Sequence, residues 1–233
     1  MSDGLINGPV AAACGLIAIV MLAIAVVRAR SDLDDRTAPM AGLVTAFVFA
    51  VQMINFPILP GASGHLLGGA LVAILVGPWV GMICISIVLA VQALLFADGG
   101  LTALGANIVN MAIISVFVGY GVAMLMRGAA RRSRGGLLAT AFLAALLGTV
   151  AASLGFVVEY AIGGAGGASL GTVFVLMVGF HVLIGIGEGV ITAATVGAVA
   201  AIRPDLVYLL RGSGPALELR GKSTSDVTEE SAS

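Results

Sequence analysis

Two histidines are the only imidazoles in the chain, and both lie among apolar residues. His65 is flanked by Gly64 and followed by Gly68-Gly69. A neutral imidazole is the commonest protein ligand for late divalent metals, and the glycines would let the ring turn inward. From position alone, the simpler interpretation is an interfacial histidine that hydrogen-bonds a loop carbonyl. A metal-ligating histidine is the alternative.

The second histidine, His181, is seven residues before Glu188. In a helix this spacing places both on one side, about two turns apart. Ionisable groups at membrane depth are costly and suggest function, here a proton relay or a metal site. However, Gly185-x-Gly187-x-Gly189 also predicts a close helix–helix contact. Packing, or docking of a partner, explains the pair at least as well.

A third polar group comprises Asp98, Asn107 and Asn110. Asp98 is suited to starting a helix, because its carboxylate can accept hydrogen bonds from free backbone N–H groups. The two asparagines share a helix face. Such asparagines either hydrogen-bond between helices or hold a metal-ligating side chain in orientation. Hydrogen bonding between helices is the favoured interpretation.

The elements that carry these residues must lie in a membrane. The 233 residues are 60% hydrophobic and 10% charged, whereas a soluble domain has roughly 25% charged residues. The net charge of −1 offers no basic field for nucleic acid. Cys14 and Cys84 lie in apolar runs and are expected to be packed thiols.

Seven apolar runs predict an all-α membrane bundle of about seven transmembrane helices within residues 1–211. Residues 212–233 are rich in Gly, Ser, Thr and charge, and predict a disordered cytoplasmic tail. The runs are Pro9–Val27, Pro39–Phe56, Leu66–Val76, Trp79–Phe96, Leu101–Met126, Leu137–Tyr160 and Leu170–Ile202.

The eleven basic residues follow the first, fifth and seventh runs. If every run spans, all of them lie on the cytoplasmic side, as the positive-inside rule requires. If the third run did not span, the later basic clusters would lie outside. The charge distribution therefore predicts that the short third run spans, extended by Gly64-His65 and Pro78-Trp79. The expected location is the plasma membrane, with the amino terminus outside and the carboxyl terminus in the cytoplasm.

Several motifs together resemble the CbiM/NikM family, the substrate-binding S components of energy-coupling-factor (ECF) cobalt and nickel transporters. The matching segments are Asn55-Phe56-Pro57, residues 64–70, Gly77-Pro78-Trp79, Gln92-Ala93-Leu94, residues 96–107, Asn110-Met111 and residues 181–189.

The resemblance implies seven transmembrane helices and an outward-facing metal site with four nitrogen ligands. These are the N-terminal amine, here that of Met1, the amide and imidazole of a second-position histidine, and a later histidine that maps onto His65. Four nitrogens suit a square-planar divalent ion. Asp3, Asn55, Ser63, Asp98, Asn107 and Asn110 map onto the polar surroundings, whereas His181 and Glu188 match a motif without an assigned ligand role.

The opening Met1-Ser2-Asp3-Gly4 departs from the family pattern, Met-His-x-Pro-Asp-Gly. Aligning the Asp-Gly pair leaves the initial Met-His absent. We expect a start codon two codons upstream that encodes Met-His. Without that histidine, metal affinity should be severely reduced.

The expected function is cobalt uptake for cobalamin synthesis, with nickel as the near alternative and no cofactor besides the transported ion. The only lysine is Lys222 and no ATP-binding motif occurs, so a partner must hydrolyse ATP. The resemblance implies a transmembrane coupling (T) subunit, a small accessory membrane subunit and cytoplasmic ATPases, all assembled in the lipid bilayer. Rival hypotheses are an intramembrane hydrolase using His181 and Glu188, and a vitamin-binding S component, for which one Trp and three Tyr are a poor supply of aromatics.

Overall fold

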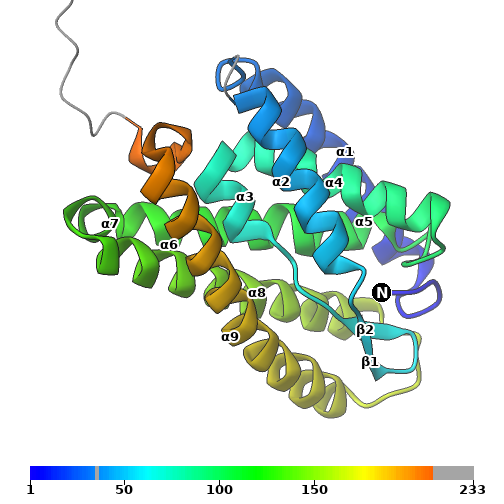
Figure 1. The fold of residues 1–233 in the computed structure, drawn as a ribbon. Coiled ribbons are helices and arrows are strands. Elements are labelled where there is room, and N and C mark those ends of the chain that lie inside the picture. Colours follow the sequence, from blue (N-terminus) through cyan, green and yellow to red (C-terminus); the bar gives the residue numbers. More distant parts are fainter. Residues whose placement is uncertain (35–36, 212–233) are drawn as a thin grey trace, which may run out of the picture.

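The computed structural model describes residues 1–34 and 37–211 and is almost entirely helical (Figure 1). Arg36 and the expected tail from residue 212 onward lie outside the described residues. The helices are α1 (Gly8–Ala29), α2 (Thr37–Gln52), α3 (Gly69–Val76), α4 (Pro78–Leu95), α5 (Leu104–Asn107), the π-helix η1 (Ile108–Ile114), α6 (Ser115–Leu125), α7 (Arg127–Arg132), α8 (Arg134–Gly163), α9 (Leu170–Ile202), and the 3₁₀ turns η2 (Pro204–Leu206) and η3 (Tyr208–Leu210).

All seven apolar runs form helices in the expected order. Within the described ranges, five helical segments are long and apolar enough to cross a membrane: α1, α4, the continuous segment Leu104–Leu125, α8 and α9. Helix α2 is apolar but has only 16 residues. The mostly helical membrane fold is confirmed, and the count of seven spans remains a prediction.

The expected extension of the third run by Gly64-His65 and Pro78-Trp79 is wrong. Helix α3 has eight residues, so it is about 12 Å long against a hydrocarbon core of about 30 Å. Gly68, with φ of 78°, precedes the helix in the left-handed conformation, and Gly77, with φ of 90°, ends it. Pro78 is the first residue of α4, where its missing N–H costs no hydrogen bond.

A short hairpin occupies the connection between α2 and α3, and the sequence did not predict it. Strand β1 (Phe56–Leu59) pairs antiparallel with β2 (Ala62–Gly64), with Phe56 opposite Gly64. Gly61 has a φ of 80°, which suits the turn between the strands. Phe56 therefore belongs to the hairpin rather than to the second span. The hairpin carries the chain directly to His65.

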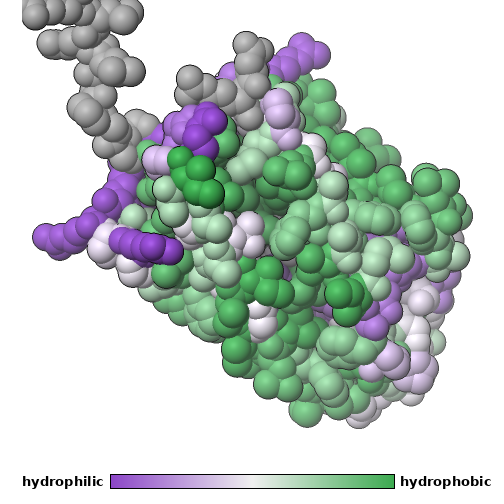
Figure 2. Space-filling model, in the orientation of Figure 1, coloured by the Kyte–Doolittle hydropathy of each residue, from purple (hydrophilic) through white to green (hydrophobic). Residues whose placement is uncertain are grey.

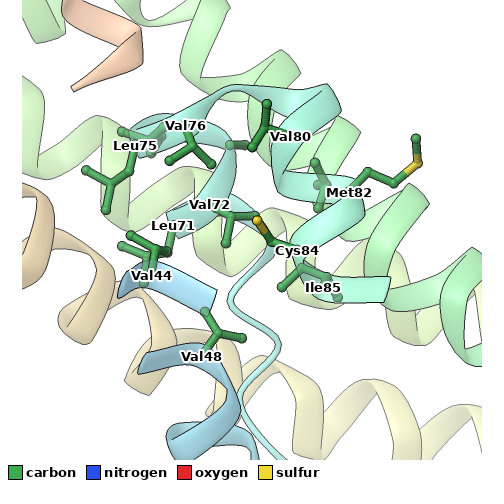
Figure 3. Packing of buried hydrophobic residues seen from close by; sticks show 14 of the residues in the cluster. Val44, Val48, Leu71, Val72, Leu75, Val76, Val80, Met82, Cys84 and Ile85 are labelled. Atoms are coloured by element: carbon green, nitrogen blue, oxygen red, sulfur yellow. The ribbon is translucent and has the colours of Figure 1, made fainter. Parts of the chain in front are cut away.

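Helix α3 is the centre of the core, and all eight of its residues are buried. Its side chains pack against Val44 and Val48 of α2 and against Val80 and Ile85 of α4 (Figure 3). A helix that is apolar on every side is expected where neighbours surround it completely. Cys14 and Cys84 are both buried and free, which confirms the expectation of packed thiols.

Basic residues from separate parts of the sequence meet at one end of the bundle. Arg127 donates hydrogen bonds to the carbonyls of Leu209 and Arg211, at 3.1 and 2.9 Å. Arg211 in turn donates to the hydroxyl of Thr37 at 2.7 Å. The N-terminus and the hairpin lie at the opposite end (Figure 1), and a largely apolar surface lies between the two polar ends (Figure 2). Arginines that follow the fifth and seventh runs therefore lie at one end of the bundle, and the side of the membrane that this end faces stays a prediction.

Helices α8 and α9 pack closely along one another through alternate glycines of the Gly185-x-Gly187-x-Gly189 motif. A Cβ atom on Gly185 would lie 3.2 Å from the backbone of Leu146, and one on Gly189 would lie 3.0 Å from the carbonyl oxygen of Phe142. Gly187 faces open space. The predicted close contact is thus present, on one side of α9.

We therefore expect Gly185→Ala and Gly189→Ala each to destabilise the fold by about 1–3 kcal/mol, because the added methyl group overpacks the contact. Gly187→Ala is the matched control and should be neutral or slightly stabilising, since alanine favours helix. Thermal unfolding of the three variants in detergent measures the difference. Equal melting temperatures for all three would contradict this account of the contact.

Candidate metal site

Both histidines line a single cavity of about 50 Å³ near the N-terminus. This is room for a small number of water molecules. The walls come from the N-terminus, the hairpin, the α5–η1 region, α8 and α9. The lining residues are Met1, Ala62, Ser63, His65, Leu67, Asn107, Asn110, Met111, Ala152, Ser153, Phe156, Met177 and His181.

The N-terminal amine is held in this cavity by Asn107. The amine donates to Asn107 Oδ1 at 2.9 Å, and Asn107 Nδ2 donates to the Met1 carbonyl at 3.1 Å. The N–H of Gly100 also donates to that carbonyl, at 3.0 Å. Burial lowers the pKa of the amine, and this favours the neutral form that can bind a metal.

Asp3 anchors the chain just after Met1 through hydrogen bonds to the turn before α5. Its Oδ1 accepts hydrogen bonds from the N–H and hydroxyl of Thr102, at 2.8 and 2.5 Å, and from the N–H of Ala103 at 3.2 Å. These bonds hold the pKa of Asp3 below its usual range, with the Thr102 side chain as the largest cause. Asp3 therefore satisfies free N–H groups in the turn before α5.

The prediction that Asp98 starts this helix is wrong, because α5 begins only at Leu104. Asp98 lies in the preceding loop, and its Oδ2 accepts from Asn55 Nδ2 at 2.9 Å. Neither Asp98 nor Asn55 lines the cavity. The pair instead joins the end of α2 to the loop after α4.

His65 lies in the loop between β2 and α3, next to Ser63 in the cavity wall. Its Nδ1 is 3.0 Å from the carbonyl oxygen of Leu66. Burial lowers the pKa of His65, so the ring favours the neutral form. The loop-carbonyl bond expected for an interfacial histidine is present, and it leaves Nε2 for a ligand.

Asn110 joins helices, as expected, through a carboxylate that the sequence analysis passed over. Its Nδ2 donates to Glu159 Oε2 at 2.8 Å, and Cys14 Sγ donates to Glu159 Oε1 at 3.4 Å. Glu159 is buried in α8. Its position as a lone carboxylate in an apolar run could have identified it. Asn110 lies in the π-helix η1, and π-helical turns are frequent at functional sites.

Glu188 supports the His65 loop from behind. Its carboxylate accepts hydrogen bonds from the N–H groups of Leu67 and Gly68, at 2.8 and 2.9 Å, and from the Thr149 hydroxyl at 3.0 Å. Gln52 Nε2 donates to the Leu67 carbonyl at 2.6 Å. Although His181 and Glu188 share α9, only His181 lines the cavity, while Glu188 binds the backbone before α3.

Glu188→Ala should destabilise the protein, because the buried N–H groups of Leu67 and Gly68 lose their acceptor. The expected cost is about 1–3 kcal/mol for each unsatisfied donor. Thr149→Val is the milder control, since it removes one donor and leaves both backbone bonds. Melting in detergent and hydrogen exchange of the two amides measure the effect. Unchanged protection of these amides in Glu188→Ala would contradict the assigned contact.

Comparisons with known proteins point to metal transport. Residues 1–206 match the family model CbiM, described as the cobalt uptake substrate-specific transmembrane region. A putative fused nickel transport protein, NikMN, of Archaeoglobus fulgidus is 40% identical over 88% of this chain, which spans 66% of that relative. A putative metal transport protein of Haloquadratum walsbyi is 39% identical, covering 88% of this chain and 92% of the relative.

A CbiM cobalt transport protein of Sorangium cellulosum is 34% identical over 82% of this chain and 86% of its own length. Among solved structures, a truncated transition metal transporter aligns with a TM-score of 0.80 at 29% identity, covering 87% of this chain and 98% of that one. Both the sequence and the fold thus agree with the resemblance drawn from the motifs. The chain belongs to the CbiM family of cobalt and nickel transport proteins.

Proposed function

We propose that this chain is the substrate-capturing membrane subunit of an ATP-driven ECF transporter that takes up cobalt, with nickel as the alternative ion. The observation that carries the proposal is the cavity, whose wall includes both Met1, with its N-terminal amine, and His65. Nitrogen donors of this kind bind late divalent ions of both types. Asn107 and Asp3 hold the N-terminal segment against the cavity.

The orientation follows from the distribution of charge. The arginines gather at the end of the bundle opposite the N-terminus, and the positive-inside rule assigns that end to the cytoplasm. The amino terminus and the cavity then face the outside of the plasma membrane, where the ion is captured. A pathway for cobalamin synthesis would consume the cobalt.

Energy must come from other subunits. The single lysine, Lys222, belongs to no ATP-binding motif. We therefore propose a transmembrane coupling subunit, a small accessory membrane subunit and cytoplasmic ATPases as partners. The hydrolase hypothesis has less support, because the Glu188 carboxylate accepts three hydrogen bonds and does not share the cavity with His181.

Titration calorimetry with Co²⁺ and Ni²⁺ tests metal capture. The reagent is an extended chain, in which Met-His is placed before Met1. The new terminal amine then takes the part of the Met1 amine, and with the added histidine and His65 it supplies the four-nitrogen set. It should bind one ion tightly, and His65→Ala should weaken binding by about 100-fold or more, as expected for loss of a ligand. Asn55→Ala is the control, because Asn55 bonds Asp98 outside the cavity.

The proposal would be overturned if the extended chain bound neither ion, or if His65→Ala bound as tightly as the parent. A larger loss in Asn55→Ala than in His65→Ala would place the site elsewhere.

Removing Asp3 tests how far capture depends on the docked N-terminus. Asp3→Ala in the extended chain frees the N–H groups of Thr102 and Ala103, so the N-terminal ligands are no longer held in place. We expect an affinity loss of about 10-fold, the range seen when a group that orients a ligand is removed. Calorimetry of both ions measures it, and unchanged affinity would show that docking through Asp3 is dispensable.

The ionisation of His65 gives a metal-free test. Because burial lowers its pKa, the ring should stay neutral as pH falls through about 6.5, where an exposed histidine takes up a proton. Proton competition with a metal should accordingly begin at lower pH than for an exposed imidazole. Imidazole NMR signals, assigned by their loss in His65→Ala, report the midpoint, and an ordinary or raised midpoint would contradict the expectation.

A further inference from the structure

His181 lines the same cavity as His65, although it comes from the middle of α9. These are the chain's only two histidines, and His181 is 7% exposed. The four-nitrogen set implied by the family resemblance uses only one of them. A second imidazole at the cavity therefore calls for a separate explanation.

The hydrogen bonds of the two rings determine which nitrogen is free. His181 Nδ1 lies 2.7 Å from the carbonyl oxygen of Met177, and His65 Nδ1 lies 3.0 Å from that of Leu66. A carbonyl only accepts, so in each neutral ring the proton is on Nδ1. Each Nε2 then keeps its lone pair and has no hydrogen-bond partner among the described residues. The Nε2 atoms of His65 and His181 are thus both available to bind a metal.

Asn110 adds an oxygen donor to the same cavity. Glu159 accepts from its Nδ2, which fixes the orientation of the amide. Its Oδ1 has no partner in the described part of the chain, although the side chain is 5% exposed. This oxygen lies against Gly155 of α8, where an added Cβ atom would meet it. Buried acceptors are normally satisfied, so an unpaired one on a residue of the cavity wall is available to a ligand or to a water bound to a ligand.

The remaining wall indicates how firmly an ion would be held. Met111, Phe156 and Met177 make it largely apolar, and no carboxylate of the described residues lines the cavity. Neutral donors do not offset the charge of a divalent ion, so they bind it more weakly than a set that includes anionic ligands. Weak binding of this kind suits a position that an ion occupies briefly during transport better than a position that retains the ion.

We propose that His65, His181 and Asn110 form a second, inner metal position, distinct from the N-terminal ligand set. The ion leaves the N-terminal nitrogens, remains bound to His65, and gains His181 Nε2 and the Asn110 amide oxygen, directly or through a bound water. This inference rests on the proposed function, because it gives the captured ion its next ligands.

The chain as printed and the extended chain separate the two positions. The printed chain lacks the second-position histidine and keeps only the Met1 amine and His65 of the outer ligands, so the dependence of its Co²⁺ binding on His181 reports the inner position. We expect weak one-to-one binding with a visible Co²⁺ absorption band, and His181→Gln should lower the affinity by at least about tenfold and alter the band. Ser153→Ala is the matched control, because its hydroxyl lines the cavity but donates to the Val150 carbonyl.

In the extended chain, His181→Gln should change the tight affinity by no more than about twofold, which also shows that the variant is folded. His181→Ala, with its melting temperature measured, repeats the test without the glutamine amide. The inner position is overturned if the printed chain binds no Co²⁺, or binds it equally in both His181 variants. It is also overturned if His181→Gln abolishes tight binding in a folded extended chain, because His181 would then belong to the outer set.

A parent extended chain that binds no metal would instead overturn the proposed function itself. The two failures are therefore distinguishable.

Discussion

The carboxylate of Glu188 and the backbone of Leu67 and Gly68 form the contact on which the wall of the candidate metal site depends. Helix α3 is too short to cross the bilayer, so the chain before it lies inside the protein, where backbone groups cannot reach water. Glu188 accepts from two of these N–H groups, and Gln52 donates to the intervening carbonyl. These three hydrogen bonds hold the backbone directly after His65.

The other half of the site comes from the chain end rather than from a helix. Asn107 exchanges two hydrogen bonds with Met1, and Asp3 binds the turn before α5. These contacts use short polar side chains on rigid neighbours, so a flexible terminus becomes an ordered wall of the cavity. The carboxylates of Asp3, Asp98 and Glu188 accept hydrogen bonds from backbone N–H groups, hydroxyls or an amide, and none of the three lines the cavity.

The sequence predicted the helical order, the free thiols and the α8–α9 glycine contact, because hydropathy and motif spacing are local properties. It did not predict the hairpin, the start of α3 at Gly69, or the role of Asp3 in place of Asp98. These depend on partners far along the chain, such as Thr102 for Asp3. Likewise, the seven-residue spacing placed His181 and Glu188 on one side of a helix and left function and packing open, whereas the packing around α9 gives them different neighbours.

Helix α9 nevertheless links the cavity wall at His181 to the loop that Glu188 binds, because both residues lie on this one helix. It runs without interruption from Leu170 to Ile202, with His181 at the cavity and Glu188 on the loop before α3. A rigid rod transmits rotation along its whole length, so turning α9 about its axis would displace the cavity wall and the His65 loop in the same movement. The glycine contact with α8 brings the two backbones close enough that such a rotation must overcome backbone as well as side-chain contacts. The cavity wall at His181 and the loop at His65 are consequently tied to the orientation of this one helix.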